Sequence, residues 1–398
     1  MRIAMMADTY KPHVSGVTNH ISLTSKSLAE IGHQVHIFTL GQEPAAGDEP
    51  YVVRSPGVPL SDTGFFLGFR YTKQARRQLQ SMDVIHVHHP FLSGRLALRY
   101  ARPVNIPVVF TNHSRYDLMA QAYLPLVPDE VTETILETYL PMFCRQVDAI
   151  VVPSNSVREV LRQLGVEDPI EVIPNGVEIG PFRNADPMPR APWGFSEKDT
   201  LLIYVGRVAP EKNMTLLLRA FAGVQAAYPE AALLIVGDGP VRADLEADVR
   251  QMGLGDRVHF TGNVDYAQLP GYLRAADVFV TASVTEVHPL SVIEALASGL
   301  PVAGIRAPGV QDTVIDNQTG VLAPDSLAGY TAKLTRLVGD REARAAMAAH
   351  AKASAETYDI GRTSALLADL YARLIKDGPR RRASDWRVLW RRLVNLVS

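Results

Sequence analysis

The chain has 398 residues, of which 47% are hydrophobic and 21% are charged, and its formal net charge is −2. These values are typical of a packed, soluble protein of two domains, and they give no reason to expect a nucleic-acid partner. The single cysteine, Cys144, excludes an internal disulfide and any cysteine-based metal cluster. Because no run of about 18 apolar residues occurs, the sequence predicts no membrane-spanning helix.

Short apolar segments alternate with helical patterns along the first half of the chain. The expected strands are residues 2–6, 34–40, 84–87, 108–111, 150–153 and 171–173. Residues 17–31 have apolar residues at helical spacing, and Gly32 ends that helix. Because the apolar runs are continuous rather than alternating, they predict a parallel sheet that helices cover on both faces.

A second series of the same kind follows Pro174-Asn175-Gly176. Residues 180–197 are rich in Pro, Gly and polar residues and are interpreted as a linker. The expected strands that follow are residues 201–205, 232–236, 258–260, 278–280 and 301–304. The pattern predicts an α/β protein with two Rossmann-like, doubly wound parallel-sheet domains that face each other across a cleft.

Ligands of such sheets bind outside the carboxyl ends of the strands. Gly16 follows the first strand and precedes a helix, where a backbone can approach a phosphate or sugar closely, although a plain turn is the alternative. His113 follows strand 108–111 and is placed to hydrogen-bond a substrate. Arg115 and Tyr116 beside it could contact an anionic or amphiphilic acceptor.

Four histidines raise the question of a metal: His86, His88, His89 and His113. However, His86 and His88 have the spacing of a strand, and Asp83, the only acidic residue nearby, should point to the other face of that strand. No metal site is therefore expected.

Two cations lie near one strand end in the second half. Arg207 and Lys212 could neutralise a diphosphate without a metal, and a salt-bridged turn is the alternative. Gly262 and Val264 follow the strand at 258–260 and could lie against a base.

Two glutamates stand eight residues apart in segment 285–302. Glu286 lies in an expected loop, and Glu294 lies in an expected short helix, so both could face one ligand. The N–H groups of Leu290 and Ser291, in the first turn of that helix, favour an anion. The alternative is a pair of solvated glutamates.

In this order the motifs resemble the retaining glycosyltransferases of family four, which have the GT-B fold. The resemblance covers residue 1 to about residue 375. It is carried by Gly16, His113 and residues 173–177, 205–213, 236–240, 276–280 and 286–302.

The resemblance implies a role for each of these positions. Arg207 and Lys212 would bind the donor diphosphate, together with the N–H groups of Leu290 and Ser291. Glu294 would hold the ribose hydroxyls, and Glu286 the donor sugar. Gly16 would touch the donor from the other domain, and His113 would contact the transferred sugar. The resemblance also implies a nucleoside-diphosphate sugar as donor, with UDP favoured over GDP, no cofactor, no divalent metal, and retention of the anomeric configuration.

One short segment departs from the family pattern. Val287 is bulkier than the usual small residue, and Pro289 has no N–H to offer the sugar. This departure therefore bears on which sugar the donor carries.

The acceptor is suggested by residues 111–117 and by the opening Asp8-Thr9-Tyr10, which are similar to diacylglycerol glucosyltransferases. The expected reaction moves a sugar, with glucose as the first candidate, onto a diacylglycerol-type lipid. A soluble or polyprenyl-linked acceptor, a phosphatidylinositol mannosyltransferase-like enzyme, an epimerase and a non-catalytic nucleotide-sugar-binding protein stay open as alternatives.

Two segments suggest contact with a membrane. An apolar cluster at 65–71 precedes a basic helix and could lie at a bilayer surface, or could begin a core helix. The C-terminal tail predicts an amphipathic helix for an anionic membrane, or a helix that packs on the protein. Its proposed membrane residues are Trp386, Arg387, Leu389, Trp390 and Arg391.

Four parts of the chain are therefore expected. They are an N-terminal acceptor domain (1–180), a nucleotide-sugar domain (181–357), a helix that crosses back to the first domain (358–376) and the basic tail (377–398). The expected location is cytoplasmic and peripheral, on the inner face of the cell membrane.

Overall fold

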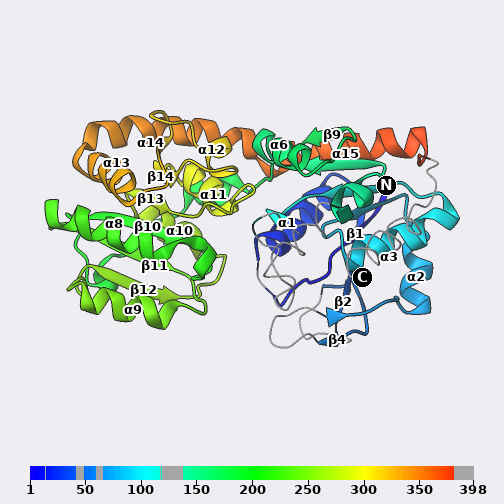
Figure 1. Cartoon of the computed structure of the whole chain (residues 1–398), viewed down its shortest axis with the longest axis horizontal. Helices are drawn as coiled ribbons and strands as arrows, with labels where there is room; N and C mark the ends of the chain where they lie inside the picture. The colour runs from blue at the N-terminus through cyan, green and yellow to red at the C-terminus, as the bar shows by residue number, and fades with distance from the viewer. Residues whose placement is uncertain (14, 42–48, 60–65, 117, 119–137, 381–398) are drawn as a thin grey trace. The chain divides into compact units, whose positions relative to one another are not determined.

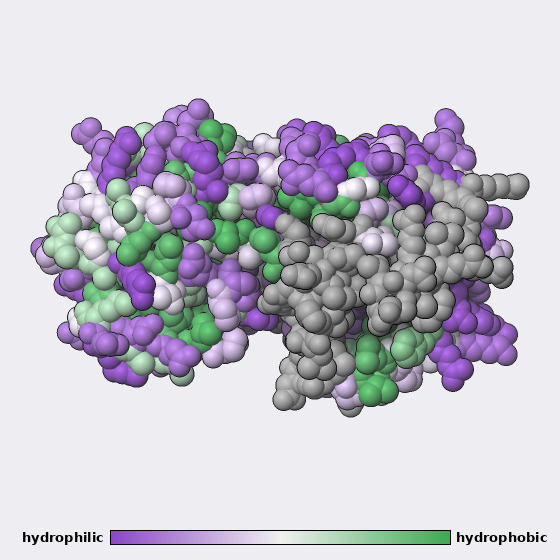
Figure 2. Space-filling view, viewed as in Figure 1, coloured by the Kyte–Doolittle hydropathy of each residue, from purple (hydrophilic) through white to green (hydrophobic). Residues whose placement is uncertain are grey.

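A computed structural model describes residues 1–13, 15–41, 49–59, 66–116, 118 and 138–380. The chain divides into two compact units (Figure 1). Unit 1 contains residues 1–176 and the chain from residue 360 onward, and unit 2 contains residues 177–359. On the face that Figure 2 shows, hydrophilic residues lie between smaller apolar areas on unit 2, and they line the upper and outer edges of unit 1.

Unit 1 is built on a seven-stranded sheet of order β3-β2-β1-β6-β7-β8-β9, in which every neighbouring pair is parallel. The strands are β1 (Arg2–Met6), β2 (Gln34–Leu40), β3 (Val52–Ser55), β6 (Val84–Val87), β7 (Val108–Thr111), β8 (Ala149–Val152) and β9 (Ile170–Val172). A separate antiparallel pair joins β4 (Val58–Pro59) to β5 (Phe66–Leu67).

Helices cover both faces of this sheet, as the continuous apolar strands predict. The helices are α1 (Gly16–Glu30), α2 (Lys73–Leu79), α3 (Leu92–Ala101), α6 (Asn155–Gln163) and α15 (Ile360–Asp377), and a 3-10 turn, η2 (Arg102–Val104), extends α3. Helices α1 and α15 share one core with alternate residues of the strands. Helix α3 lies on the other face, where Gly94 packs against Phe143, whose ring contacts Phe110.

Unit 2 repeats this plan with a six-stranded parallel sheet of order β12-β11-β10-β13-β14-β15. The strands are β10 (Thr200–Val205), β11 (Ala231–Val236), β12 (Val258–Gly262), β13 (Val278–Thr281), β14 (Val302–Ile305) and β15 (Gly320–Ala323). One core joins the sheet to α8 (Met214–Ala227), α9 (Arg242–Gln251) and α13 (Leu327–Gly339). The core on the other face includes α7 (Ile179–Asn184), α10 (Leu269–Ala275), α11 (Leu290–Ser298), α12 (Val310–Thr313) and part of α14 (Arg341–Ala355).

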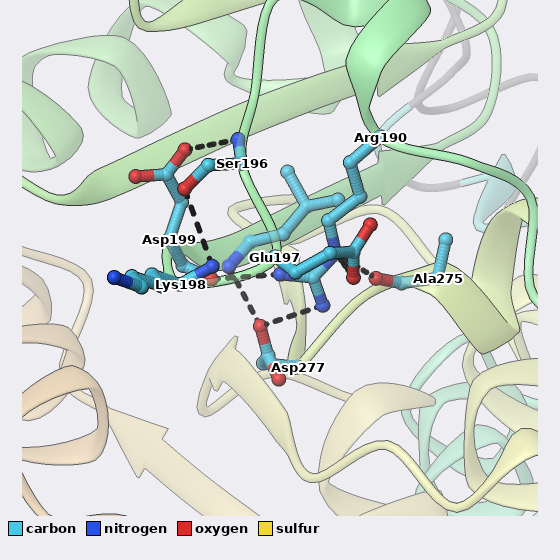
Figure 3. Close-up of polar contacts among 8 residues, drawn as sticks. Arg190, Ser196, Glu197, Lys198, Asp199, Ala275 and Asp277 are labelled. Atoms are coloured by element: carbon cyan, nitrogen blue, oxygen red, sulfur yellow. Dashed lines mark hydrogen bonds and ion pairs between the residues drawn. The ribbon is translucent and has the colours of Figure 1, made fainter.

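The segment interpreted as a linker, residues 180–197, is part of the body of unit 2. It contains most of α7 and a 3-10 turn, η3 (Ala191–Trp193), and it buries Phe182 and Phe195. Figure 3 shows how Arg190 holds it: the guanidinium donates to the carbonyl oxygens of Ala275 (2.8 Å) and Asp199 (2.7 Å). It also bonds to Asp277 at 3.1 Å. The linker interpretation is wrong because Pro and Gly here form turns over a packed surface.

Two edge strands, β3 and β15, were not predicted. Each is four residues long. Within the described residues, no helix combines the length and apolar content that crossing a bilayer requires.

Candidate active site

Three glycines bring the ends of neighbouring strands together in unit 2. Gly206, Gly237 and Gly262 follow or end β10, β11 and β12, and all three have positive φ. A Cβ at Gly237 would lie 2.0 Å from the carbonyl oxygen of Gly206, and Gly237 N–H donates to the carbonyl of Gly262 at 2.9 Å. This close backbone contact positions the loop that carries Arg207.

The cation pair predicted after β10 meets carboxylates. Lys212 Nζ lies 2.6 Å from Glu286 Oε1, and each of the two side chains is 21% exposed. Arg207 is 61% exposed and lies 3.5 Å from Glu211. Burial disfavours ionisation of Glu286, but the charge and hydrogen bond of Lys212 and a hydrogen bond from Ser283 outweigh it, so the pKa of Glu286 is lowered. The carboxylate is therefore ionised at neutral pH.

The second glutamate is buried rather than solvated. Glu294 lies on α11 with an exposed fraction of 3%, and Tyr266 Oη donates to its Oε1 at 2.8 Å. Burial raises the pKa of Glu294 to about 7, although the Tyr266 hydrogen bond acts in the opposite direction. The alternative of two solvated glutamates is wrong, because one is ion-paired and the other is enclosed by unit 2.

Helix α11 begins without a side-chain cap. Pro289 is its N-cap residue and makes no capping hydrogen bond, and the first-turn residues Leu290 and Ser291 are buried and half-buried. Because the first N–H groups of a helix lack intrahelical partners, this end suits an anion. A Cβ at Gly309 would lie 2.5 Å from the carbonyl oxygen of Glu286, so Gly309 supports the loop before α11.

The segment that departs from the family pattern is packed inward. Val287 and His288 are 6% and 5% exposed, and the ring of His288 lies edge-on to Tyr358 with centroids 5.2 Å apart. Their side chains therefore shape the loop from within unit 2. Gly262 has φ +73°, and Val264 is half-buried against the core beneath α11.

In unit 1, Gly16 is the first residue of α1, and Ser15 caps that helix. A Cβ at Gly16 would meet no described atom within 4 Å, and Gly16 is not among the glycines with positive φ. Neither packing within the described part of the chain nor backbone conformation thus requires a glycine there. The position has room for a ligand.

His113 is half-buried and lies against the buried imidazoles of His20 and His88. Its Nε2 lies 2.9 Å from Nδ1 of His88, and its ring centroid lies 4.8 Å from that of His20. Burial lowers the pKa of all three histidines, and neighbouring imidazoles lower the pKa of His88 and His113 further. Nε2 of His88 is buried without a partner among the described residues. Because a buried N–H without an acceptor is costly, we infer that His88 donates from Nδ1 and that neutral His113 carries its proton on Nδ1.

The histidines that lie close enough together to bind a metal are not the set considered in the sequence, because His20 takes the place of His86 and His89. His86 is occupied by Thr111 and Tyr371, each 2.6 Å from a ring nitrogen. Instead, ring nitrogens of His20, His88 and His113 all lie within 4.8 Å of one another, which could suit zinc.

The acceptor residues differ in their accessibility. Tyr116 is 1% exposed, with its ring edge-on to Phe91, whereas Arg115 is half-buried. The tail residues proposed for membrane contact, 386–391, lie outside the described residues.

Sequence reasoning did not identify Tyr266, Gly309 or His20 as site residues. Tyr266 and Gly309 follow strand ends without a local motif, and His20 lies inside an ordinary amphipathic helix. Only their partners in space distinguish them.

Sequence models of two families match the chain. The model of glycosyltransferase family 4 matches residues 14–180, and the model of glycosyl transferases group 1 matches residues 188–354. An alpha-monoglucosyldiacylglycerol synthase of Streptococcus pneumoniae is 31% identical over 81% of this chain and 75% of its own length. The protein of the same name from Acholeplasma laidlawii is 26% identical over 81% of this chain and 84% of its own length.

The fold also matches solved structures. Anabaena HepE in complex with UDP and glucose aligns with a TM-score of 0.74 at 17% identity, over 94% of this chain and 100% of HepE. This likeness supports the fold, and the sequence matches support the family. Both expectations from the sequence are confirmed: the chain belongs to the family-four glycosyltransferases and has two parallel-sheet domains of the GT-B type.

Proposed function

We propose that this glycosyltransferase is a retaining, metal-independent enzyme that transfers glucose from UDP-glucose to a diacylglycerol-type lipid at a membrane surface. The observation that carries the proposal is a pair of glutamates beside the uncapped start of α11, of which Glu286 is half-buried and Glu294 is buried. One is held ionised by Lys212, and the other is bonded to Tyr266. A sugar, a ribose and a diphosphate need this combination of acceptors, cations and free N–H groups.

The ion pairs in unit 2 indicate how a donor would bind. Lys212 and Arg207 are each engaged by a carboxylate, and Arg207 is largely exposed. A diphosphate carries more charge than one carboxylate, so it would draw both cations toward itself. Glu286 would then accept hydrogen bonds from sugar hydroxyls, and Glu294 from the ribose. Gly262 and Val264 would lie against the base.

The proposed chemistry proceeds on one face of the sugar. The bond between the anomeric carbon and the β-phosphate oxygen breaks, and its electron pair leaves with UDP. Arg207, Lys212 and the N–H groups of Leu290 and Ser291 stabilise that charge. The acceptor oxygen bonds to the anomeric carbon on the same face, and its proton passes to the departing phosphate oxygen. Neutral His113 donates a hydrogen bond from Nδ1 to a hydroxyl of the transferred sugar.

The names of the two relatives above support glucose and a diacylglycerol-type acceptor. Arg115 and the tail residues 386–391 would contact the lipid and the anionic membrane. The enzyme would then be peripheral, on the inner face of the cell membrane. A soluble or polyprenyl-linked acceptor is the main rival.

The test is a transfer assay with UDP-glucose and diacylglycerol in anionic vesicles, with UDP release and product mass as readouts. Glu286→Gln should lower kcat/KM at least about a hundredfold, while Glu342→Gln, on the exposed face of α14, should have no effect. The anomeric configuration of the product should be retained by NMR.

Three outcomes would overturn the proposal. They are an inverted product, full activity in Glu286→Gln, and conversion of the nucleotide sugar without an acceptor, which would indicate an epimerase.

A further inference from the structure

Three imidazoles of unit 1 meet at one point, although they come from three different elements. His88 directly follows β6, and His113 lies just beyond the end of β7. These two strands are parallel neighbours, with Val87 opposite Phe110, so their carboxyl ends bring the two histidines together. His20 reaches the same point from the second turn of α1. One ring nitrogen from each histidine lies within 4.8 Å of the other two.

No described residue explains the ring nitrogens of His20. Both are buried and have no hydrogen-bond partner among the residues that the structure describes, and the same is true of Nε2 of His88. The two residues are 5% and 0% exposed. A buried polar atom without a partner destabilises a fold, whereas a phenylalanine ring would fill the same space without that cost. These nitrogens therefore indicate a partner that the described residues do not supply.

The spacing of the three nitrogens fits a metal ion. In a tetrahedral zinc site the Zn–N distance is about 2.0–2.1 Å, which places the ligand nitrogens about 3.3 Å apart. The distance of 2.9 Å between Nδ1 of His88 and Nε2 of His113 lies below this value, and the 4.8 Å limit of the cluster lies above it. Small rotations of the side chains would therefore complete the site. Three imidazoles with one open position are a common zinc ligand set.

The ligand set selects among metals. Imidazole nitrogen suits zinc, copper and nickel, whereas magnesium and calcium prefer oxygen ligands. Nε2 of His113 already bonds to His88, so a metal has to replace that hydrogen bond. His88 then keeps its proton on the ring nitrogen that faces away from the metal, and no proton is released. Only an ion with high affinity for imidazole can compete in this way, which favours zinc over magnesium.

Two features make binding at this site reversible. His113 is half-buried, so one side of the cluster is open to solvent and leaves a coordination position for water. Histidines of permanent zinc sites also donate their second N–H to an acceptor, but no described residue bonds to His20 or to Nε2 of His88. Zinc bound here would therefore exchange with solvent.

We propose that His20, His88 and His113 form a zinc-binding site, and that the enzyme is inactive while zinc occupies it. The inhibition rests on the proposed function, in which His113 contacts the transferred sugar. His20 lies one helical turn from Gly16, the expected donor contact. Two positive charges beside the sugar would oppose the positive charge that develops at the anomeric carbon as its bond to UDP breaks. The active enzyme therefore holds no metal at this site.

The site itself is tested by adding Co²⁺ alone, and Zn²⁺ alone, to the untagged full-length protein without donor. Co²⁺ bound by three imidazoles should give the strong visible absorption of a four-coordinate ion, and zinc should displace it. His20→Phe removes two unpartnered nitrogens, so it should be at least as stable as the wild type and should bind zinc at least about a hundredfold more weakly. His350→Gln, at an exposed histidine of α14, is the control and should bind zinc as the wild type does. His20→Leu, whose side chain is smaller, replaces His20→Phe if the phenyl ring is not accommodated.

Inhibition is measured for each variant against its own metal-free rate of transfer. Zinc that saturates the wild-type site should lower transfer by the wild type at least about tenfold, and should leave His20→Phe within about twofold of its own rate. Equal zinc affinities of the wild type and His20→Phe, the weak absorption of six-coordinate Co²⁺, or equal inhibition of both proteins would each overturn the proposal.

Two further outcomes separate this proposal from the proposed function. A loss of transfer in EDTA that zinc restores would overturn the inhibitory role, because the metal would then be required. Zinc binding that His20→Phe abolishes, in a protein that transfers no sugar, would support the site and contradict the proposed function alone.

Discussion

The enclosed carboxyl of Glu294 should make donor binding depend on pH near neutrality. Burial raises the pKa of this group from 4.5 to about 7, because water is replaced by the packed interior of unit 2 and a single phenol. If ribose hydroxyls donate to it, the ionised form binds the donor and the protonated form binds it poorly. We therefore expect affinity for UDP-glucose to fall as the pH is lowered through about 7.

The size of the effect follows from the pKa. A group with a pKa of about 7 is half ionised at pH 7 and about one tenth ionised at pH 6. The dissociation constant for UDP-glucose should then rise about fivefold between those two values and approach about tenfold for each further pH unit. Glu294→Gln keeps the shape and removes the titration, so its affinity should be weak and nearly constant with pH.

The assay is isothermal titration calorimetry between about pH 6 and pH 8. UDP-glucose is the correct probe, because the terminal phosphate of free UDP itself titrates near neutral pH. Glu342→Gln, exposed on α14, should keep the wild-type profile, and a 2′-deoxy donor should lose part of the dependence. A constant dissociation constant in the wild type, or an unchanged pH profile in Glu294→Gln, would refute the reasoning.

Four further predictions follow from the same geometry. Lys212→Met removes the cation 2.6 Å from Glu286, so the pKa of that carboxyl should rise and UDP-glucose affinity should fall at least about tenfold. Lys376→Met is the control. Equal UDP-glucose affinities of the two variants would contradict the role of Lys212 in donor binding. Because the folded-state pKa of Glu294 lies above 4.5, the contribution of this group to the free energy of unfolding should fall between pH 4.5 and about 7. In urea titrations, Glu294→Gln should therefore be more stable than the wild type at pH 8 by up to about 3 kcal/mol, and no more stable at pH 4. Gly237→Ala places a Cβ 2.0 Å from the Gly206 carbonyl oxygen at φ +135° and should cost at least about 2 kcal/mol of stability. Gly16→Ala, in contrast, should keep the unfolding midpoint and lower kcat/KM. The reverse pattern would count against both assignments. Dialysis against EDTA should leave transfer unchanged, and a loss that zinc restores would instead assign a metal to His20, His88 and His113.

Much of the fold was predictable because its signals are local. A strand such as β1 is a continuous apolar run, and its residues from Ile3 to Met6 are fully buried; a sequence of that kind has few other stable environments. The order of strands and helices then predicts parallel sheets, since parallel neighbours need crossover connections. Residues 180–197 show the limit of this reasoning, because composition does not show that Phe182 and Phe195 are buried or that Arg190 joins three backbone segments.

The two glutamates of segment 285–302 show the same division at the site. Their spacing, the helix that carries Glu294 and the turn after it are local properties, and the sequence alone determined them. Only the tertiary structure decided their ionisation, because the groups responsible come from elsewhere in the chain: Lys212 lies 74 residues from Glu286, and Tyr266 lies 28 residues from Glu294. In unit 1, likewise, His20, His88 and His113 come from three separate segments. A pKa depends on charge, hydrogen bonding and solvent exclusion at a point in space, and folding assembles that point from distant residues.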